Sequence, residues 1–160
     1  MIGAVLFGLV IALSIVTAVV RVASADSRTA GLAPLIVLAY PFWVLAEVAA
    51  FEVGAFVTIR RPEWHRQFQL ASFFAFIAPA TVRALRFVIP AGPAVTYGSL
   101  LISLLLYAGT ASLKDQSGNL SRAFLVAVGV QLLAALLLFA SSSGAQPWLQ
   151  FASLLTGYPL

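Results

Sequence analysis

Residues 33–59 read APLIVLAYPFWVLAEVAAFEVGAFVTI, and only two of these side chains, Glu47 and Glu52, are charged. With a helical rise of about 1.5 Å per residue, this stretch is long enough to cross a hydrocarbon core of roughly 30 Å. Inside lipid, backbone N–H and C=O groups have to be paired within the segment, which favours an α-helix. Residues 33–59 therefore predict a membrane-spanning helix.

The rest of the sequence repeats this pattern. Only 9% of the 160 residues are charged and 62% are hydrophobic, whereas soluble domains carry about 25% charged residues. We therefore predict one all-α integral membrane helical bundle. The expected five spans are about 2–22, 33–59, 63–89, 94–113 and 122–140. A helix at about 147–157 is too short to cross a bilayer, so we expect it to lie in the interface.

Details of the turns support these boundaries. Pro62 fits the first position of a helix, and Ser121 fits the N-cap position of the helix that follows it. Small residues recur in the last two spans and predict close helix packing there; these are Gly98, Ala108, Gly109, Ala127, Gly129, Ala134 and Ala135. The alternatives left open are cleavage after residues 22–25 and a sixth span beyond the C-terminus.

The distribution of basic residues predicts an orientation. One side of the membrane has five basic residues and the other has four; the five are Arg60, Arg61, Arg66, Lys114 and Arg122. The positive-inside rule therefore places the 60–66 and 114–122 loops in the cytoplasm, with the N-terminus inside and the C-terminus outside. Spread over several turns, these charges are expected to meet anionic lipid head groups rather than nucleic acid.

The carboxyl groups of the second span need an explanation. Glu47 is 12 to 13 residues before Arg60, which places it near the middle of the membrane, where a charge costs at least a few kcal/mol unless it is paired or neutralised. Arg83 and Arg86, near the end of the next span, are candidate partners. The functional hypothesis is an intramembrane ion pair of Glu47 or Glu52 with these arginines that lines a polar pocket or a proton path. The alternatives are a structural pair, or an interfacial arginine together with a protonated glutamate.

The turn between the second and third spans is the most polar part of the chain. His65 is the only histidine, and there is no cysteine. We expect no metal site, because a metal needs more ligands than one imidazole. We also expect no haem or other cofactor, although a haem shared by two copies of His65 is a weaker hypothesis. The expected role of this turn is interfacial anchoring by Arg60, Arg61, Trp64, His65 and Arg66.

The remaining polar side chains predict packing rather than catalysis. Gln69 and Gln131 are expected to hydrogen-bond between helices. No serine has the neighbouring base that a nucleophile needs, and the sequence has no phosphate-binding loop or zinc-protease motif. An enzymatic activity is therefore not expected.

Residues 60–70, RRPEWHRQFQL, and residues 77–83, IAPATVR, together resemble a motif of uncharacterised bacterial multi-pass membrane proteins. In these proteins, a helix opens with basic residues, proline and a histidine-basic pair, and then reaches a proline-alanine step and an arginine. The resemblance places His65 and Arg83 in the motif, and it implies a bacterial inner-membrane protein without implying an activity.

The sequence leads to three functional hypotheses. The first is a small non-enzymatic protein that acts as an accessory or structural component of a membrane assembly, with a protein partner or a second copy of itself. The second is a proton- or solute-handling protein that uses Glu47, Glu52 and Arg83. The third is a haem-binding electron carrier built on His65.

Overall fold

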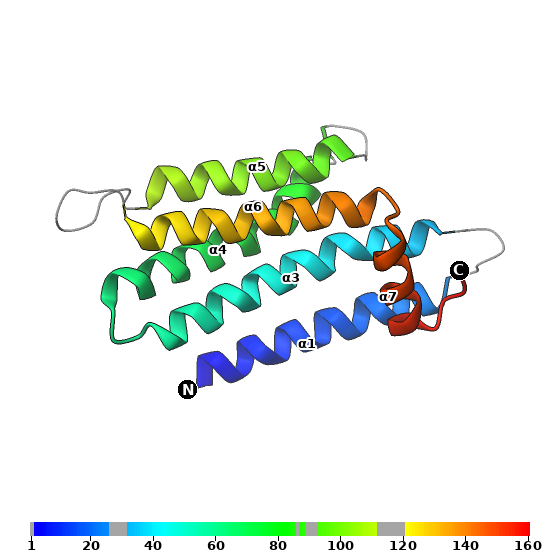
Figure 1. The fold of residues 1–160 in the computed structure, drawn as a ribbon, viewed down its shortest axis with the longest axis horizontal. Helices are drawn as coiled ribbons and strands as arrows, with labels where there is room; N and C mark the ends of the chain where they lie inside the picture. Colours follow the sequence, from blue (N-terminus) through cyan, green and yellow to red (C-terminus); the bar gives the residue numbers. More distant parts are fainter. Residues whose placement is uncertain (1, 26–31, 86, 89–92, 112–120) are drawn as a thin grey trace. The chain divides into compact units, whose positions relative to one another are not determined.

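A computed structural model describes residues 2–25, 32–85, 87–88, 93–111 and 121–160. The described residues form six α-helices and no β-strand (Figure 1). The helices are α1 (Ile2–Ala23), α3 (Ala33–Val57), α4 (Pro62–Leu85), α5 (Pro93–Thr110), α6 (Arg122–Ser142) and α7 (Gln146–Thr156). The prediction of an all-α fold is confirmed, and each helix lies within a few residues of its expected position.

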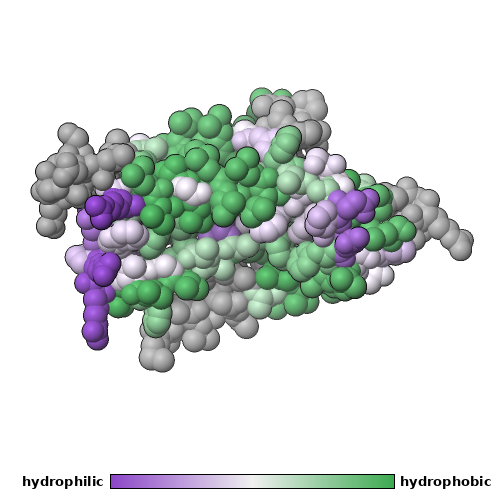
Figure 2. All heavy atoms as spheres, viewed as in Figure 1, coloured by the Kyte–Doolittle hydropathy of each residue, from purple (hydrophilic) through white to green (hydrophobic). Residues whose placement is uncertain are grey.

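Three of these helices are long and apolar enough to cross a membrane. They are α3, α4 and α6, and each has a window of 18 residues with a mean hydropathy of 1.4 or more. Large apolar side chains are exposed along them, among them Val53, Phe56, Phe73 and Leu133. In Figure 2, hydrophobic residues cover much of the face drawn, and hydrophilic residues gather near the end at which α4 and α6 begin.

The chain divides into two compact units. The first comprises Met1–Leu45 and Leu136–Leu160, and the second comprises Ala46–Ala135. The first unit therefore joins segments that are far apart in the sequence, whereas the second is continuous. Helices α3 and α6 each contribute residues to both units.

In the first unit, α7 packs with α1 and with the beginning of α3. The indole N–H of Trp148 donates a hydrogen bond of 2.9 Å to the carbonyl of Leu35, and the indole N–H of Trp43 donates one of 2.9 Å to Ser141 Oγ. Phe42 contacts both indoles, with ring centroids 5.2 and 5.4 Å away. The buried residues of α7 are Trp148, Leu149, Ala152 and Thr156. Phe151 and Leu155 of the same helix are exposed.

In the second unit, α4 and α5 pack side by side (Figure 1). Tyr107 of α5 is fully buried, and its hydroxyl donates a 3.0 Å hydrogen bond to Oε1 of Gln67 on α4. The Tyr107 ring also stacks on Phe124 of α6, with centroids 5.5 Å apart. One tyrosine therefore joins three helices through a polar contact and an aromatic one.

A glycine sets the distance between α3 and α4. A Cβ atom added to Gly54 would lie 2.9 Å from Cδ2 of Phe68, which is closer than real Cβ atoms approach. The expected close packing at Gly98, Gly109 and Gly129 is not seen, since a Cβ atom at any of these positions would have no neighbour within 4 Å. Close approach in this unit therefore occurs between α3 and α4 rather than at the glycines of α5 and α6.

A side chain caps the beginning of α6 and also contacts the beginning of α4. Ser121 precedes α6, and its hydroxyl oxygen accepts a 3.3 Å hydrogen bond from the amide of Phe124, which confirms the predicted N-cap. The same hydroxyl donates to Glu63 Oε1 at 2.5 Å. Glu63 is in the first turn of α4, where the helix dipole favours a negative charge. This pair joins the beginnings of α4 and α6.

A candidate intramembrane binding cavity

The second unit contains a cavity of about 240 Å³ whose lining comes from α3, α4, α5 and α6. Most of the lining is apolar and includes Leu100, Leu101, Leu104, Leu132 and two alanines. The polar lining residues are Glu47, Tyr97, Ser103 and Gln131. A concave apolar site with a few polar groups is the usual form of a small-molecule site.

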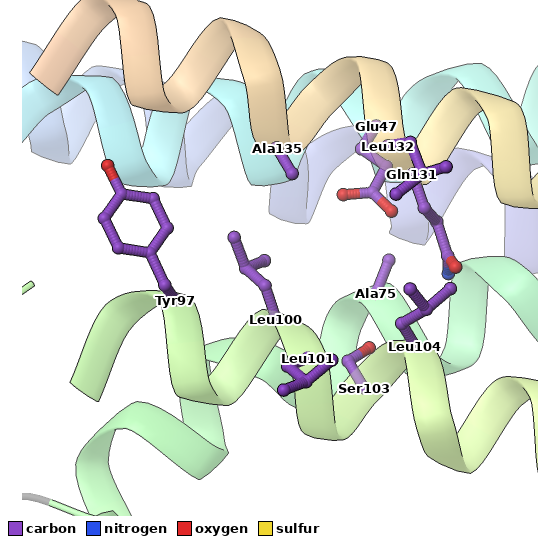
Figure 3. Close-up of a pocket in the computed structure, with 10 residues that line it drawn as sticks. All are labelled: Glu47, Ala75, Tyr97, Leu100, Leu101, Ser103, Leu104, Gln131, Leu132 and Ala135. Atoms are coloured by element: carbon purple, nitrogen blue, oxygen red, sulfur yellow. The ribbon is translucent and has the colours of Figure 1, made fainter. Parts of the chain in front are cut away.

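Glu47 is the central polar group of this cavity. Its side chain is 7% exposed, and Figure 3 shows its carboxyl group pointing into the space between α5 and α6. The described residues include no ion pair or hydrogen bond to this carboxyl group. A carboxylate in such a place is costly, since translocon scales give about 2.5–3.5 kcal/mol for a charge at the centre of a spanning helix.

Gln131 supplies a second polar group from α6. The residue is 8% exposed, and its Oε1 atom is buried without a hydrogen-bond partner among the described residues. The sequence predicted Gln131 as an amide that hydrogen-bonds between helices, and for Oε1 this is wrong. A buried acceptor without a donor costs about 1–3 kcal/mol. The cavity therefore holds a carboxyl group and an amide oxygen for which the described residues supply no hydrogen-bond donor.

The interior proline of α4 affects the backbone at a residue that lines the cavity. Pro79 has no N–H, so the carbonyl of Ala75, one helical turn earlier, lacks its usual amide donor. Ala75 lines the cavity. At the preceding residue, the carbonyl of Phe74 accepts a 2.5 Å hydrogen bond from the buried Ser103 hydroxyl. The hydroxyl hydrogen of Ser103 is thus directed at α4, and it is not a donor to Glu47.

Arg83 is not the partner of Glu47 that the sequence predicted. Arg83 is exposed, and the part of the chain that the structure describes has no ion pair between it and Glu47. Arg86 lies outside the described residues. Glu52 is not in the cavity lining, and its Oε1 accepts a 2.6 Å hydrogen bond from Ser72 of α4. The structure therefore separates the two glutamates, with Glu47 at the cavity and Glu52 at the α3–α4 contact.

In the 60–66 turn, which was expected to act as an interfacial anchor, His65 makes a hydrogen bond to the end of α3. Its Nδ1 lies 2.8 Å from the carbonyl oxygen of Ala55, in the last turn of α3. A carbonyl only accepts, so Nδ1 carries the hydrogen. The amide of Ile59 bonds to Phe56 instead, which leaves Ala55 without its usual donor. His65 therefore caps the C-terminal end of α3, where the dipole also favours such a group.

The other residues of the turn remain at the surface or near it. Arg60, Arg61 and Arg66 are exposed, as anchors at a membrane interface would be. Trp64 is half-buried and packs against Phe68, with ring centroids 5.8 Å apart. Among the described residues, no cluster of three or more His, Cys, Asp or Glu side chains could hold a metal ion.

The predicted amide on α4 was assigned to the wrong residue. Gln69 is exposed, whereas Gln67 is fully buried and accepts the hydrogen bond from Tyr107. The helical period gives a signal for this difference, because Gln67 is four residues before the small Ala71 and Gln69 is four before the bulky Phe73. The leucines and Ser103 of α5 that line the cavity have no comparable signal.

We compared the chain with known protein families, curated proteins and solved structures, and none of them matches it.

Proposed function

We propose that this chain is a multi-pass membrane protein that binds a small, mainly apolar solute in the cavity beside Glu47. The observation that carries the proposal is the position of a buried carboxyl group in an apolar cavity of about 240 Å³. An engineered apolar cavity of about 150 Å³ already binds benzene, so a compound of similar size can be accommodated. This cavity supports the solute-handling hypothesis in a form in which Glu47 is the central residue and Glu52 and Arg83 take no part.

The membrane setting is part of the same proposal. Five spans would be α1, α3, α4, α5 and α6, of which α1 and α5 have 22 and 18 residues. Both are mainly apolar, and segments of about 17–25 residues can cross a bilayer. The motif resemblance supports a bacterial inner membrane as the location, and the basic residues support a cytoplasmic position of the 60–66 turn.

A neutral probe tests the cavity. The protein in lipid nanodiscs would be titrated with 4-fluorotoluene, and a bound ¹⁹F NMR signal would be sought. We expect saturable binding to the natural chain. Ala135→Phe, which places a ring at the cavity wall, should abolish the bound signal. The matched control is Ala134→Phe on the same helix, because Ala134 does not line the cavity, and this variant should keep it.

Two results would refute the proposal. One is the absence of saturable binding to the natural chain, and the other is equal binding to the Ala135 and Ala134 variants. Either result would favour the alternative of an accessory component in a membrane assembly, since that role needs no ligand in this cavity. Co-purification of a stoichiometric partner in mild detergent would then be the informative measurement.

A further inference from the structure

We infer that the solute is an organic ammonium ion, taken up in exchange for the proton of Glu47. This inference rests on the proposed function, since it names the chemical class that the same cavity would bind. It is drawn from the polar groups of the cavity, from their missing donors and from the surrounding apolar side chains.

The polar groups of the cavity can accept hydrogen bonds from a ligand. Glu47 and Gln131 are both more than nine-tenths buried, and Oε1 of Gln131 has no donor among the described residues. Ser103 directs its hydroxyl hydrogen to the carbonyl of Phe74 at 2.5 Å. An ammonium group has N–H donors and no acceptor, so it matches a carboxylate and an amide oxygen. Charge-assisted bonds of this kind are roughly twice as strong as neutral ones.

An ionised Glu47 would need a cation beside it. In the bilayer core, either a lone carboxylate or a lone cation is costly, whereas a close pair is neutral as a whole. Arg83 is exposed and does not pair with Glu47. Since no cationic side chain among the described residues pairs with Glu47, we assign the cationic partner of an ionised Glu47 to the ligand. Tyr97 of α5 is the one titratable lining residue besides Glu47. The lining residues from α4 and α6 have no titratable side chain.

The apolar lining of the cavity limits the rest of the ligand. Leu100, Leu101, Leu104 and Leu132 form an apolar wall that suits a hydrocarbon group. A metal cation such as Na⁺ or Ca²⁺ is a poorer match, because hard cations take about six or more oxygen ligands and these leucines supply none. The best match is a small primary amine with a compact apolar group.

Binding then exchanges one cation for another. An aqueous ammonium ion, R–NH₃⁺, and the neutral carboxyl group of Glu47 give the ion pair of carboxylate and ammonium and release one H⁺ to water. The total charge is +1 on both sides, so no further reactant is needed. Protons compete with the amine for Glu47, and the affinity for the amine should therefore fall as the pH is lowered.

The test compares two probes that differ in their polar group. 4-Fluorobenzylamine and 4-fluorotoluene would be titrated in nanodiscs and followed by ¹⁹F NMR. We expect the amine to bind at least about tenfold more tightly, which corresponds to about 1.4 kcal/mol. The amine stays protonated between about pH 5 and 8. As the pH is raised through this range, the Kd of the amine should fall by up to about tenfold per pH unit. A pH indicator in weak buffer should report one proton released per amine bound.

Variants separate the two levels of the proposal. Glu47→Gln should remove the preference for the amine and keep 4-fluorotoluene binding, and Gln131→Leu should weaken amine binding several-fold. Glu52→Gln is the matched control and should change neither. If 4-fluorotoluene binds and the amine has no advantage, the ammonium inference fails and the cavity proposal stands. If neither probe binds, both fail. Amine binding without proton release would refute the exchange.

Discussion

His65 shows how one side chain can complete the hydrogen bonding of a helix end. The carbonyl of Ala55 lacks an amide donor in the last turn of α3. The Thr58 hydroxyl reaches it only at 3.4 Å, whereas the imidazole of the next helix donates at 2.8 Å. The sequence identified His65 as the most unusual residue of the turn, but it predicted only contact with the membrane surface.

We predict that His65→Ala lowers the free energy of unfolding in detergent by about 0.5–1.5 kcal/mol, the usual net value of one such hydrogen bond. His65→Asn should recover part of the loss, because its amide nitrogen lies close to the position of Nδ1. Gln69→Ala, at an exposed site on the same helix, is the control and should change stability by less than about 0.5 kcal/mol. Equal losses in the Ala and Asn variants would contradict the cap.

The hydrogen bond between Gln67 and Tyr107 allows a second test of a single contact. Their hydrogen bond of 3.0 Å is between two fully buried side chains. Interhelical hydrogen bonds in membrane proteins average about 0.6 kcal/mol and reach about 1.7. A double-mutant cycle of Gln67→Leu and Tyr107→Phe, measured by unfolding in detergent, should give a coupling energy in this range. Strictly additive losses would show that the contact does not contribute.

At the scale of elements, the sequence predicts where helices lie but not how they face one another. Apolar runs of spanning length located the five longer helices, whereas α7 is too short for this signal. Position along a helix also follows from the sequence, and Glu47 lies in the middle part of α3, as its place in the apolar stretch predicts. Its direction around the helix axis relative to Arg83 does not follow, since that depends on how α3 and α4 are rotated. The pairing prediction failed for this reason.

The contact between α3 and α4 gives a prediction with an internal control. Alanine is a better helix former than glycine by about 1 kcal/mol. At Gly98, where a Cβ atom would have no neighbour within 4 Å, alanine should be neutral or stabilising. At Gly54, the added methyl group would meet Phe68, which is buried between Phe51 and Trp64. Gly54→Ala should therefore destabilise the protein by about 1–3 kcal/mol.

Thermal unfolding of the two glycine variants in the same detergent would check this difference. The decisive quantity is the sign of the change in each variant. Stabilisation by Gly54→Ala would mean that α3 and α4 are further apart than the structure indicates. A Gly54→Ala, Phe68→Leu double variant should recover stability if the clash with the ring is the cause.

At the scale of the whole molecule, the natural chain contains no cysteine, so each introduced thiol is unique. We predict that cysteines at Ser24 and at Arg61 are labelled from opposite sides of the membrane, because α3 lies between them and is long enough to span. A membrane-impermeant maleimide applied to intact cells should label Ser24→Cys, and Arg61→Cys should react only after the membrane is opened. Labelling of both from one side would refute the proposed topology.

The two units show which contacts the sequence does not predict. The second unit is continuous, and its packing depends on helices that follow one another. The first depends on contacts between distant segments, such as Trp148 with Leu35, which are 113 residues apart. Periodicity and hydropathy describe each helix by itself, so they contain no information on which distant helices meet.

This separation also has a consequence for biosynthesis. A ribosome that adds about 5–20 residues per second takes roughly 6–23 s to make the 113 residues from Leu35 to Trp148. During that interval the second unit is synthesised completely, whereas the first still lacks the helix that contributes its indole hydrogen bond. The nascent chain therefore has an intrinsic order of assembly, in which a continuous unit is available to fold first and the unit built from both ends is completed last.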